Sequence, residues 1–385
     1  MSRKLRAVIA VPLVLVVGLY VATWALKVPP PQTLYKLLTT PTSQVGKLYP
    51  ASDVPATRPA ALPVKAQPLP ATVPWKGRQV PVAEFLSATR TNAFVVLRDG
   101  AVAHEWYREG VRSTDRMASW SVAKSLVSLM IGQAVGEGKI REDDRLVDVL
   151  PELRSGGSYD TIRIRDLLDM TAGVDVSENY NQWWPFTGTA RMYLTRDLAG
   201  FVKDHRKVTF RPGSKGDYRS VETQLLGMAL AKVEGKPLAR LLAERLWGPV
   251  GAQDGATWNL DRPGGIEKAF CCVNATARDY AKIGQLVLEG GKAGGAQVVP
   301  AEWIKRISTP AAHKLGEWRY AAQWWHPTGG DERAFSALGV YGQYVYVDPP
   351  SRTVIVKLSD HGDEQDEQDT FDVLRTISRS AAGSR

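Results

Sequence analysis

The sequence predicts an α/β (α+β) domain in which the N-terminal and C-terminal segments of the folded region form one antiparallel sheet, with helices between and around them. Three observations support this class. A β-hairpin pattern lies near residue 100, segments with helical periodicity fill the middle of the chain, and β-rich runs return after residue 318. Because strands are expected at both ends, we expect the two ends to meet in one sheet.

The first strands are predicted at residues 93–98 and 101–107, two β-rich runs joined by Asp99-Gly100. This dipeptide is typical of two-residue hairpin turns. Near the C-terminus, β-rich runs are followed by a last helix, whose acidic residues come first and basic residues last, as the helix dipole favours. The late strands are predicted at residues 318–325, 335–340, 344–347 and 353–358.

The central helix begins after Ser121 and is apolar on nearly all sides, which is typical of a helix in the middle of a domain. Its first turn nevertheless carries Lys124, which lies three positions after Ser121 and therefore on the same face. Burying a lysine is costly unless it is paired or loses its proton. A neutral amine beside a serine is what nucleophile activation requires. The spacing alone also fits a capping serine and a lysine that extends to the surface.

The net charge of +9 is confined to the beginning of the chain. Residues 1–78 contain ten Lys and Arg residues and one acidic residue, Asp53. Residues 79–385 therefore have no net charge, with 39 basic and 39 acidic residues. A domain without a basic excess lacks the electrostatic signature of nucleic-acid binding, so we expect no nucleic-acid partner.

The N-terminal segment predicts membrane attachment. Three basic residues precede residues 7–26, which are uncharged and, as a helix, would span about 30 Å, the thickness of a bilayer core. We expect residues 1–27 to be a cytoplasmic tip and an uncleaved transmembrane anchor, which places the domain on the extracytoplasmic or periplasmic side. A cleaved signal peptide is the alternative interpretation.

The domain organisation follows from composition. Residues 28–78 contain eleven of the 24 prolines, which predicts an extended, semi-rigid linker. The folded domain is expected at residues 79–385. Its sheet part is predicted at residues 79–115 and 315–385, and its helical part at residues 116–314.

Cysteine and histidine usage predicts neither a disulfide nor a metal site. Cys271 and Cys272 are adjacent, and the Cα span between neighbouring residues is too short for an ordinary disulfide. We expect two small buried hydrophobic residues there. The five histidines lack the spacing of metal ligands, and no cofactor motif is present, so we expect neither a metal nor a cofactor.

Three stretches resemble a known superfamily by their order and context. Ser121-Val-Ala-Lys124 opens the central helix, Tyr218-Arg219-Ser220 follows a Pro-Gly turn, and Gly339-Val-Tyr-Gly-Gln343 is placed on a late strand. This arrangement is similar to the serine β-lactamase and penicillin-binding protein superfamily. Surrounding phrases resemble the branch that contains class C β-lactamases, family VIII esterases and 6-aminohexanoate-dimer hydrolases.

The resemblance implies a β-lactamase/DD-peptidase-like fold and an amide or ester hydrolase. It makes Ser121 the nucleophile, Lys124 its general base and Tyr218 the proton relay to the leaving group. A phenol can relay protons only if a cation such as Lys124 lowers its pKa. The backbone N–H groups of Ser121 and Gln343 would form the oxyanion hole. The residues implied to bind substrate are Tyr180, Asn274, Tyr341 and Gly342.

One element departs from the superfamily pattern. Where penicillin-recognising members have Lys-Thr-Gly, this chain has Val340-Tyr341-Gly342, so the lysine that attracts a β-lactam carboxylate is missing. This favours an esterase or amidase over a β-lactamase or DD-peptidase. A non-catalytic protein that binds cell-wall or peptide ligands in the same cleft remains an alternative. Glu178 and Asp175 are expected to face solvent, with contact to an amine-bearing substrate as the alternative.

Overall fold

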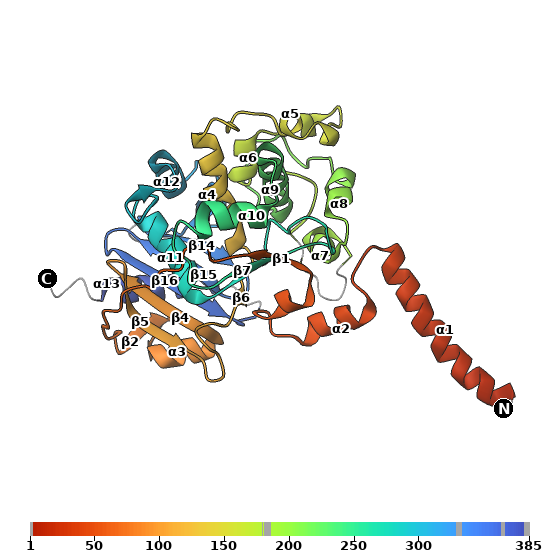
Figure 1. The fold of residues 1–385 in the computed structure, drawn as a ribbon, viewed down its shortest axis with the longest axis horizontal. Helices are drawn as coiled ribbons and strands as arrows, with labels where there is room; N and C mark the ends of the chain where they lie inside the picture. Colours follow the sequence, from red (N-terminus) through yellow and green to blue (C-terminus); the bar gives the residue numbers. More distant parts are fainter. Residues whose placement is uncertain (1–2, 179, 181–185, 329–332, 363–365, 381–385) are drawn as a thin grey trace.

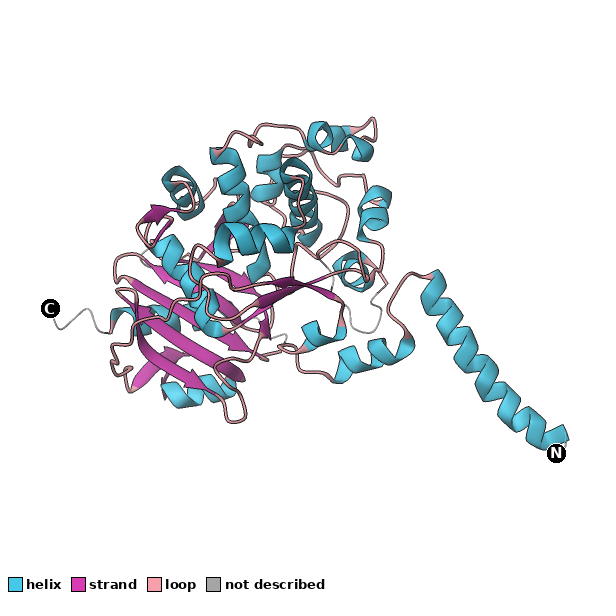
Figure 2. Cartoon of the chain, viewed as in Figure 1, coloured by secondary structure: helices cyan, strands magenta, loops and turns pink. Residues whose placement is uncertain are grey.

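An eight-stranded antiparallel sheet lies at the centre of the fold (Figures 1 and 2). The computed structural model describes residues 3–178, 180, 186–328, 333–362 and 366–380, with side chains from residue 14 onward. The strand order is β11-β12-β13-β14-β15-β16-β4-β5, so the first hairpin joins the edge of the C-terminal strands. The predicted assembly of the sheet from both ends of the domain is therefore confirmed. The bounds are β4 (Thr91–Arg98), β5 (Ala101–Tyr107), β11 (Lys314–Leu315), β12 (Trp318–Ala321), β13 (Trp324–His326), β14 (Phe335–Gly339), β15 (Gln343–Asp348) and β16 (Thr353–Ser359).

Helices cover both faces of this sheet. Side chains of a strand alternate between faces, so Val95 and Leu97 of β4 join the large core with the helical region, whereas Phe94 and Val96 pack on the opposite side. Helix α11 (Ala277–Leu288) packs on the first face. Helices α3 (Val82–Ala88) and α13 (Glu367–Arg379) pack on the second face. Because both faces are covered, the central strands β4, β15 and β16 are buried along their whole length.

The helical region lies between the two halves of the sheet in sequence and is organised around α4 (Val122–Gly136), the helix predicted after Ser121. Its other helices are α5 (Leu146–Val149), α6 (Ile164–Leu168), α7 (Gly188–Leu194), α8 (Leu198–Asp204), α9 (Ser220–Glu234), α10 (Leu238–Leu242) and α12 (Ala301–Ser308). Short 3₁₀ turns occupy η2 (Pro151–Leu153) and η3 (Ser158–Thr161), and η4 (Ala243–Trp247) is a π-helical turn.

A second, four-stranded sheet leads into α4. Its order is β1-β7-β8-β6, and β6 ends three residues before Ser121. The strands are β1 (Ala51–Val54), β6 (Met117–Ala118), β7 (Ala256–Asn259) and β8 (Val273–Ala275). Two small hairpins complete the structure, β2 (Thr72–Trp75) with β3 (Arg78–Pro81), and β9 (Lys292–Ala293) with β10 (Ala296–Gln297).

The extended linker predicted for residues 28–78 is wrong in this structure. The segment contains α2 (Pro31–Thr39), the 3₁₀ turn η1 (Val45–Leu48), β1 and β2, and Figure 1 shows it alongside the domain. Val45, Val54 and Val73 are buried. Pro30 and Pro31 begin α2, and Pro50 and Pro55 flank β1, positions where a missing N–H is tolerated. Apolar residues between the prolines pack on the domain.

The N-terminal helix α1 (Arg3–Ala25) projects away from the domain (Figure 1). From residue 14 onward, where side chains are described, no helix is both long and apolar enough to cross a bilayer.

Candidate active site

A tight turn between β6 and α4 holds Ser121 at the start of the buried helix. Trp120, directly before it, has a φ of 46°, a left-handed backbone conformation that is rare for a bulky residue and points to a functional constraint. Gly339, the last residue of β14, lies against this turn. A Cβ atom at Gly339 would lie 2.6 Å from the carbonyl oxygen of Ser119 and 3.0 Å from the backbone nitrogen of Ser121. Only glycine permits this approach of the two backbones.

Lys124 lies one helical turn after Ser121 and is buried, with 1% of its surface exposed. Its Nζ atom is 2.7 Å from Oγ of Ser121 and donates to the carbonyl oxygen of Phe270 at 2.8 Å. Burial lowers the pKa of Lys124 to about 7, because a low-dielectric environment disfavours the ammonium ion, and Glu178 opposes only part of this shift. A substantial fraction of Lys124 is therefore neutral at physiological pH.

Tyr218 reaches the same place from the loop before α9. Lys124 Nζ lies 5.1 Å from the centre of its ring, and the Tyr218 phenol also interacts with the Ser121 hydroxyl. The rings of Tyr320 and Trp325 pack around it at 6.2 and 5.3 Å. The structure thus brings together three side chains from the first two motifs, which lie almost a hundred residues apart in sequence.

The expectation that a cation lowers the pKa of Tyr218 is wrong. Burial raises this pKa well above its usual value, Glu178 raises it further, and the hydrogen bond with Ser121 offsets only part of the increase. The physical reason is that the phenolate would be desolvated and would lie near the Glu178 carboxylate, and both disfavour a negative charge on Tyr218. Tyr218 is therefore a protonated phenol that can donate a hydrogen bond.

Glu178 was expected to face solvent, but it connects the loop to α9. Its carboxylate accepts hydrogen bonds from the backbone N–H of Ser220 at 2.8 Å, the Ser220 hydroxyl at 2.6 Å and the Thr189 hydroxyl at 2.9 Å. The hydroxyl of Tyr180 also donates to it. A carboxylate at the first turn of a helix satisfies N–H groups that lack helical partners. Asp175 is exposed, as expected.

A pocket of about 420 Å³ opens beside the Ser121 turn. Trp120 and Tyr341 lie in its wall with ring centres 4.8 Å apart, and Tyr193 stacks on Trp120 at 5.6 Å. Tyr180, which was expected to contact substrate, also lines this pocket. Residues 34–45 line it as well, which sequence reasoning missed because their proline content indicated a linker.

The remaining expected site residues lie in different surroundings. Gln343 is buried opposite Gly339 in the sheet, and its side chain is bonded to Tyr341 and Ser359. Gly342 is in the turn between β14 and β15 rather than on a strand, with a φ of 82°. These positions place Gly339, rather than Gln343, directly against the backbone of the Ser121 turn.

Asn274 lies on β8 with 7% of its surface exposed. Its amide donates to Thr257, Asn259 and the carbonyl oxygen of Cys272, at 3.1 to 3.3 Å. These contacts hold the small sheet together, and they do not direct the side chain into the pocket.

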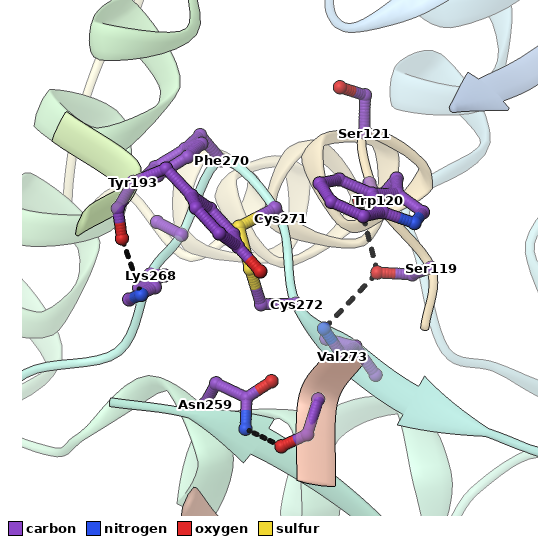
Figure 3. Close-up of a disulfide and its surroundings, with 12 residues drawn as sticks. Ser119, Trp120, Ser121, Tyr193, Asn259, Lys268, Phe270, Cys271, Cys272 and Val273 are labelled. Carbon is purple, nitrogen blue, oxygen red and sulfur yellow. Dashed lines mark hydrogen bonds between the residues drawn. A yellow bond between two sulfur atoms is a disulfide. The ribbon is translucent and has the colours of Figure 1, made fainter. Parts of the chain in front are cut away.

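Cys271 and Cys272 form a disulfide, so the expectation of two unpaired residues is wrong (Figure 3). The prediction compared them with ordinary disulfides, whose Cα atoms are farther apart than the 3.7 Å found here. A tight ring closes because Cys272 adopts a left-handed φ of 77°. Both residues are buried, as expected. The disulfide follows Phe270, whose carbonyl oxygen contacts Lys124.

Over the described part of the chain, no three His, Cys, Asp or Glu side chains are grouped in a way that could hold a metal ion.

Comparison with known proteins gives the relationships of the chain. The beta-lactamase family matches residues 82–377. A 6-aminohexanoate-dimer hydrolase from Paenarthrobacter ureafaciens is 30% identical over 340 residues, which cover 82% of this chain and 84% of that protein. A candidate 6-aminohexanoate-dimer hydrolase from Bacillus anthracis has a similar structure, with a TM-score of 0.79 and 24% identity over 92% of this chain and 95% of its own. A family VIII carboxylesterase shares the fold with a TM-score of 0.63 and 18% identity, over 77% and 95% of the two chains.

Proposed function

The chain belongs to the beta-lactamase family and is a hydrolase of that family, and on this premise we propose that it cleaves an amide or ester bond through an acyl-enzyme on Ser121. The observation that carries the proposal is the 2.7 Å approach of Lys124 Nζ to Ser121 Oγ at a buried position. In the described part of the chain, the hydrogen-bond partners of this buried amine are the Ser121 hydroxyl and the Phe270 carbonyl rather than a carboxylate, which makes its burial costly, and a role as base accounts for it.

In the acylation step, the neutral amine of Lys124 accepts the hydroxyl proton of Ser121 while Oγ attacks the substrate carbonyl carbon. The pKa of about 7 suits this role, because the free amine is abundant at neutral pH and the resulting ammonium still releases its proton readily. The carbonyl oxygen gains negative charge as the tetrahedral intermediate forms. Backbone N–H groups of Ser121 and of the turn after Gly339 are suited to stabilise it.

Collapse of the intermediate requires a proton on the leaving group. Tyr218 is protonated and lies beside both Lys124 and Ser121, so it donates its proton to the departing nitrogen or oxygen and regains one from the Lys124 ammonium. The carbon–nitrogen or carbon–oxygen bond breaks and leaves the acyl group on Ser121. Water then attacks the ester with Lys124 and Tyr218 in the reverse roles, which restores the free enzyme.

The substrate class is proposed from the relatives and from the third motif. The relatives named above are hydrolases of an amide dimer and of carboxylic esters. Val340-Tyr341-Gly342 supplies no cation for a β-lactam carboxylate. An amide or ester without a required carboxylate is therefore the proposed substrate, ahead of a β-lactam or a cell-wall peptide.

Covalent labelling tests the acyl-enzyme. The full chain is treated with a fluorophosphonate and digested, and the modified peptide is identified by mass spectrometry. We expect a single adduct on Ser121 and loss of p-nitrophenyl ester and amide turnover in proportion to labelling.

In Tyr218→Phe, turnover should fall by about 10²-fold or more, because leaving-group protonation is lost. An adduct on another serine, or an unmodified protein that binds ligands without turnover, would refute the proposal.

A further inference from the structure

The N-terminal segment that contains α2 and η1 forms a wall of the pocket beside Ser121. Leu34, Leu37 and Leu38 of α2 line the pocket, and Val45 of η1 lies next to them. The three leucines have the i, i+3, i+4 spacing that gathers side chains on one helical face. Trp120 and Tyr341 also line the pocket. Trp120 directly precedes Ser121 in sequence, and Tyr341 lies in the turn between β14 and β15.

The same segment is anchored to the residues around Ser121. The backbone N–H of Ala118 donates to the carbonyl oxygen of Ser43 at 2.9 Å, and Nε1 of Trp120 donates to that of Thr42 at 3.2 Å. Asp360, which follows β16, accepts hydrogen bonds from the Thr42 hydroxyl at 2.9 Å and the Ser43 N–H at 2.7 Å. The pocket wall is therefore joined directly to the turn that carries the candidate nucleophile.

The α2 leucines are not part of a packed core. Leu34 and Leu37 are half-buried, and Leu38 is 75% exposed. Among the described residues that line this pocket, none carries a charge. An apolar cavity of this kind gains free energy from each methylene that it removes from water, and it disfavours a charged group that would be left without a partner.

We propose that residues 31–48 are the specificity element of this hydrolase and complete a subsite for an uncharged, straight alkyl portion of the substrate. This inference rests on the proposed function, because it assigns the substrate portion that lies beside the Ser121 acyl-enzyme. The alkyl chain belongs either to the acyl group or to the leaving group. The pocket disfavours an ammonium or carboxylate at the end of that alkyl group, because none of the described residues that line it carries a compensating charge.

Chain-length series test the subsite in the full-length protein. One series consists of p-nitrophenyl acetate, butyrate, hexanoate and octanoate, and the other of ethyl, butyl, hexyl and octyl acetates. In the series that enters the pocket, kcat/KM should rise about three- to fourfold per added methylene. The p-nitrophenyl ester of 6-aminohexanoic acid should react at least about tenfold more slowly than the hexanoate if the acyl group enters. The same comparison with 6-aminohexyl acetate applies to the leaving group.

Variants on both walls identify the element responsible. Leu34→Gln and Leu37→Gln should flatten the chain-length dependence. Ala190→Trp, on α7 across the pocket, should move the optimum to shorter chains because it fills the cavity. The matched control is Tyr35→Gln, a neighbour on α2 that is 68% exposed and should behave like the wild type. Unfolding midpoints confirm that each variant is folded.

Two outcomes would overturn the subsite. One is a wild-type dependence that is flat in both series, and the other is a dependence that Leu34→Gln, Leu37→Gln and Ala190→Trp all leave unchanged. Calorimetric binding of neutral N-alkylacetamides to Ser121→Ala separates this failure from failure of the proposed function. Chain-length-dependent binding without any Ser121-dependent turnover would refute the hydrolase mechanism and retain the pocket. Turnover without chain-length dependence would retain the mechanism and refute the subsite.

Discussion

Among the described residues, two buried lysines each lie within hydrogen-bond distance of a serine, and we propose a catalytic role for only one of these pairs. Ser121 and Lys124 approach to 2.7 Å, and Ser359 and Lys357 approach to 2.6 Å. Burial lowers the pKa of both lysines to about 7. The two pairs are therefore nearly equivalent in the distance between amine and hydroxyl, in the burial of the amine, and in the pKa of the lysine.

The pairs differ in access and in the groups around the serine. Ser121 is partly exposed at the start of α4, beside the pocket and against the backbone of Gly339. Ser359 is fully buried at the end of β16, and its backbone N–H already donates to the side chain of Gln343. A lysine of lowered pKa beside a serine is therefore not enough to make that serine a catalytic nucleophile. A substrate must also reach the hydroxyl, and backbone donors must be free for the oxyanion.

The largest expected effect comes from removing each hydroxyl in turn. Ser121→Ala should lower kcat by at least about 10³-fold, because no acyl-enzyme can form. Ser359→Ala should leave kcat for the same p-nitrophenyl ester within error of the wild type. Steady-state kinetics of the two purified variants measure both effects. Comparable losses in the two variants would show that Ser359 also supports the reaction and would end the distinction.

Replacing each lysine with methionine should have an intermediate effect on kcat/KM. Lys124→Met should lower kcat/KM by about 10²- to 10⁴-fold through loss of the general base. In the wild type, kcat/KM should rise with pH through about 7 as the ammonium loses its proton, and then level off. In Lys357→Met, kcat/KM should still rise with pH, because the Lys357 amine contacts Ser359 and the Gly342 turn rather than Ser121. The test is a pH–rate profile for each variant, and a profile that persists in Lys124→Met would assign the base to another group.

The smallest expected effect concerns stability, and it isolates Lys357. Its pKa is about 7 in the folded protein and about 10.4 in an unfolded chain. Between these values the unfolded chain binds a proton that the folded chain does not, so this residue makes the fold more stable as pH rises, by about 1.4 kcal/mol per pH unit. Below about pH 7 both states are protonated and the dependence disappears.

Denaturant unfolding of Lys357→Met and of the wild type, from about pH 7 to 9, measures this contribution. The free energy of unfolding should rise less steeply with pH in the variant, by about 1.4 kcal/mol per unit. If the free energy of unfolding depends on pH equally in the variant and the wild type, Lys357 keeps an ordinary pKa when buried. The two serine–lysine pairs would then resemble each other in geometry but not in the pKa of the lysine.

Much of the fold was predictable because its signals are local. The Asp99-Gly100 turn and its flanking β-rich runs predicted the hairpin that became β4 and β5. The apolar run after Ser121 predicted α4 as a buried helix. What failed were interpretations based on composition. Proline content predicted a linker where α2 packs beside the pocket, and adjacent cysteines predicted no disulfide where Cys272 adopts a left-handed turn.

The candidate site was only partly predictable for the same reason. Nothing in the spacing of Glu178 indicates that it meets Ser220, since that contact depends on how a loop lies against α9. The proximity of Tyr218 to Ser121 and Lys124 was expected, but the pKa of Tyr218 was expected to fall and is instead raised. Burial of the phenol and the nearby Glu178 carboxylate raise that pKa, and both effects depend on how loops and helices distant in sequence pack around Tyr218.

The sequence by itself determined that Ser121 and Lys124 share a helical face, because residues three apart lie together in any α-helix. It also determined that this helix is buried, because it has no polar face. Long-range packing, by contrast, leaves Ser121 partly exposed next to a pocket that Trp120 lines, buries Ser359 completely, and places a distant N-terminal segment in the pocket wall. Access and enclosure depend on which surfaces pack together over long separations in the chain, and backbone periodicity does not encode that.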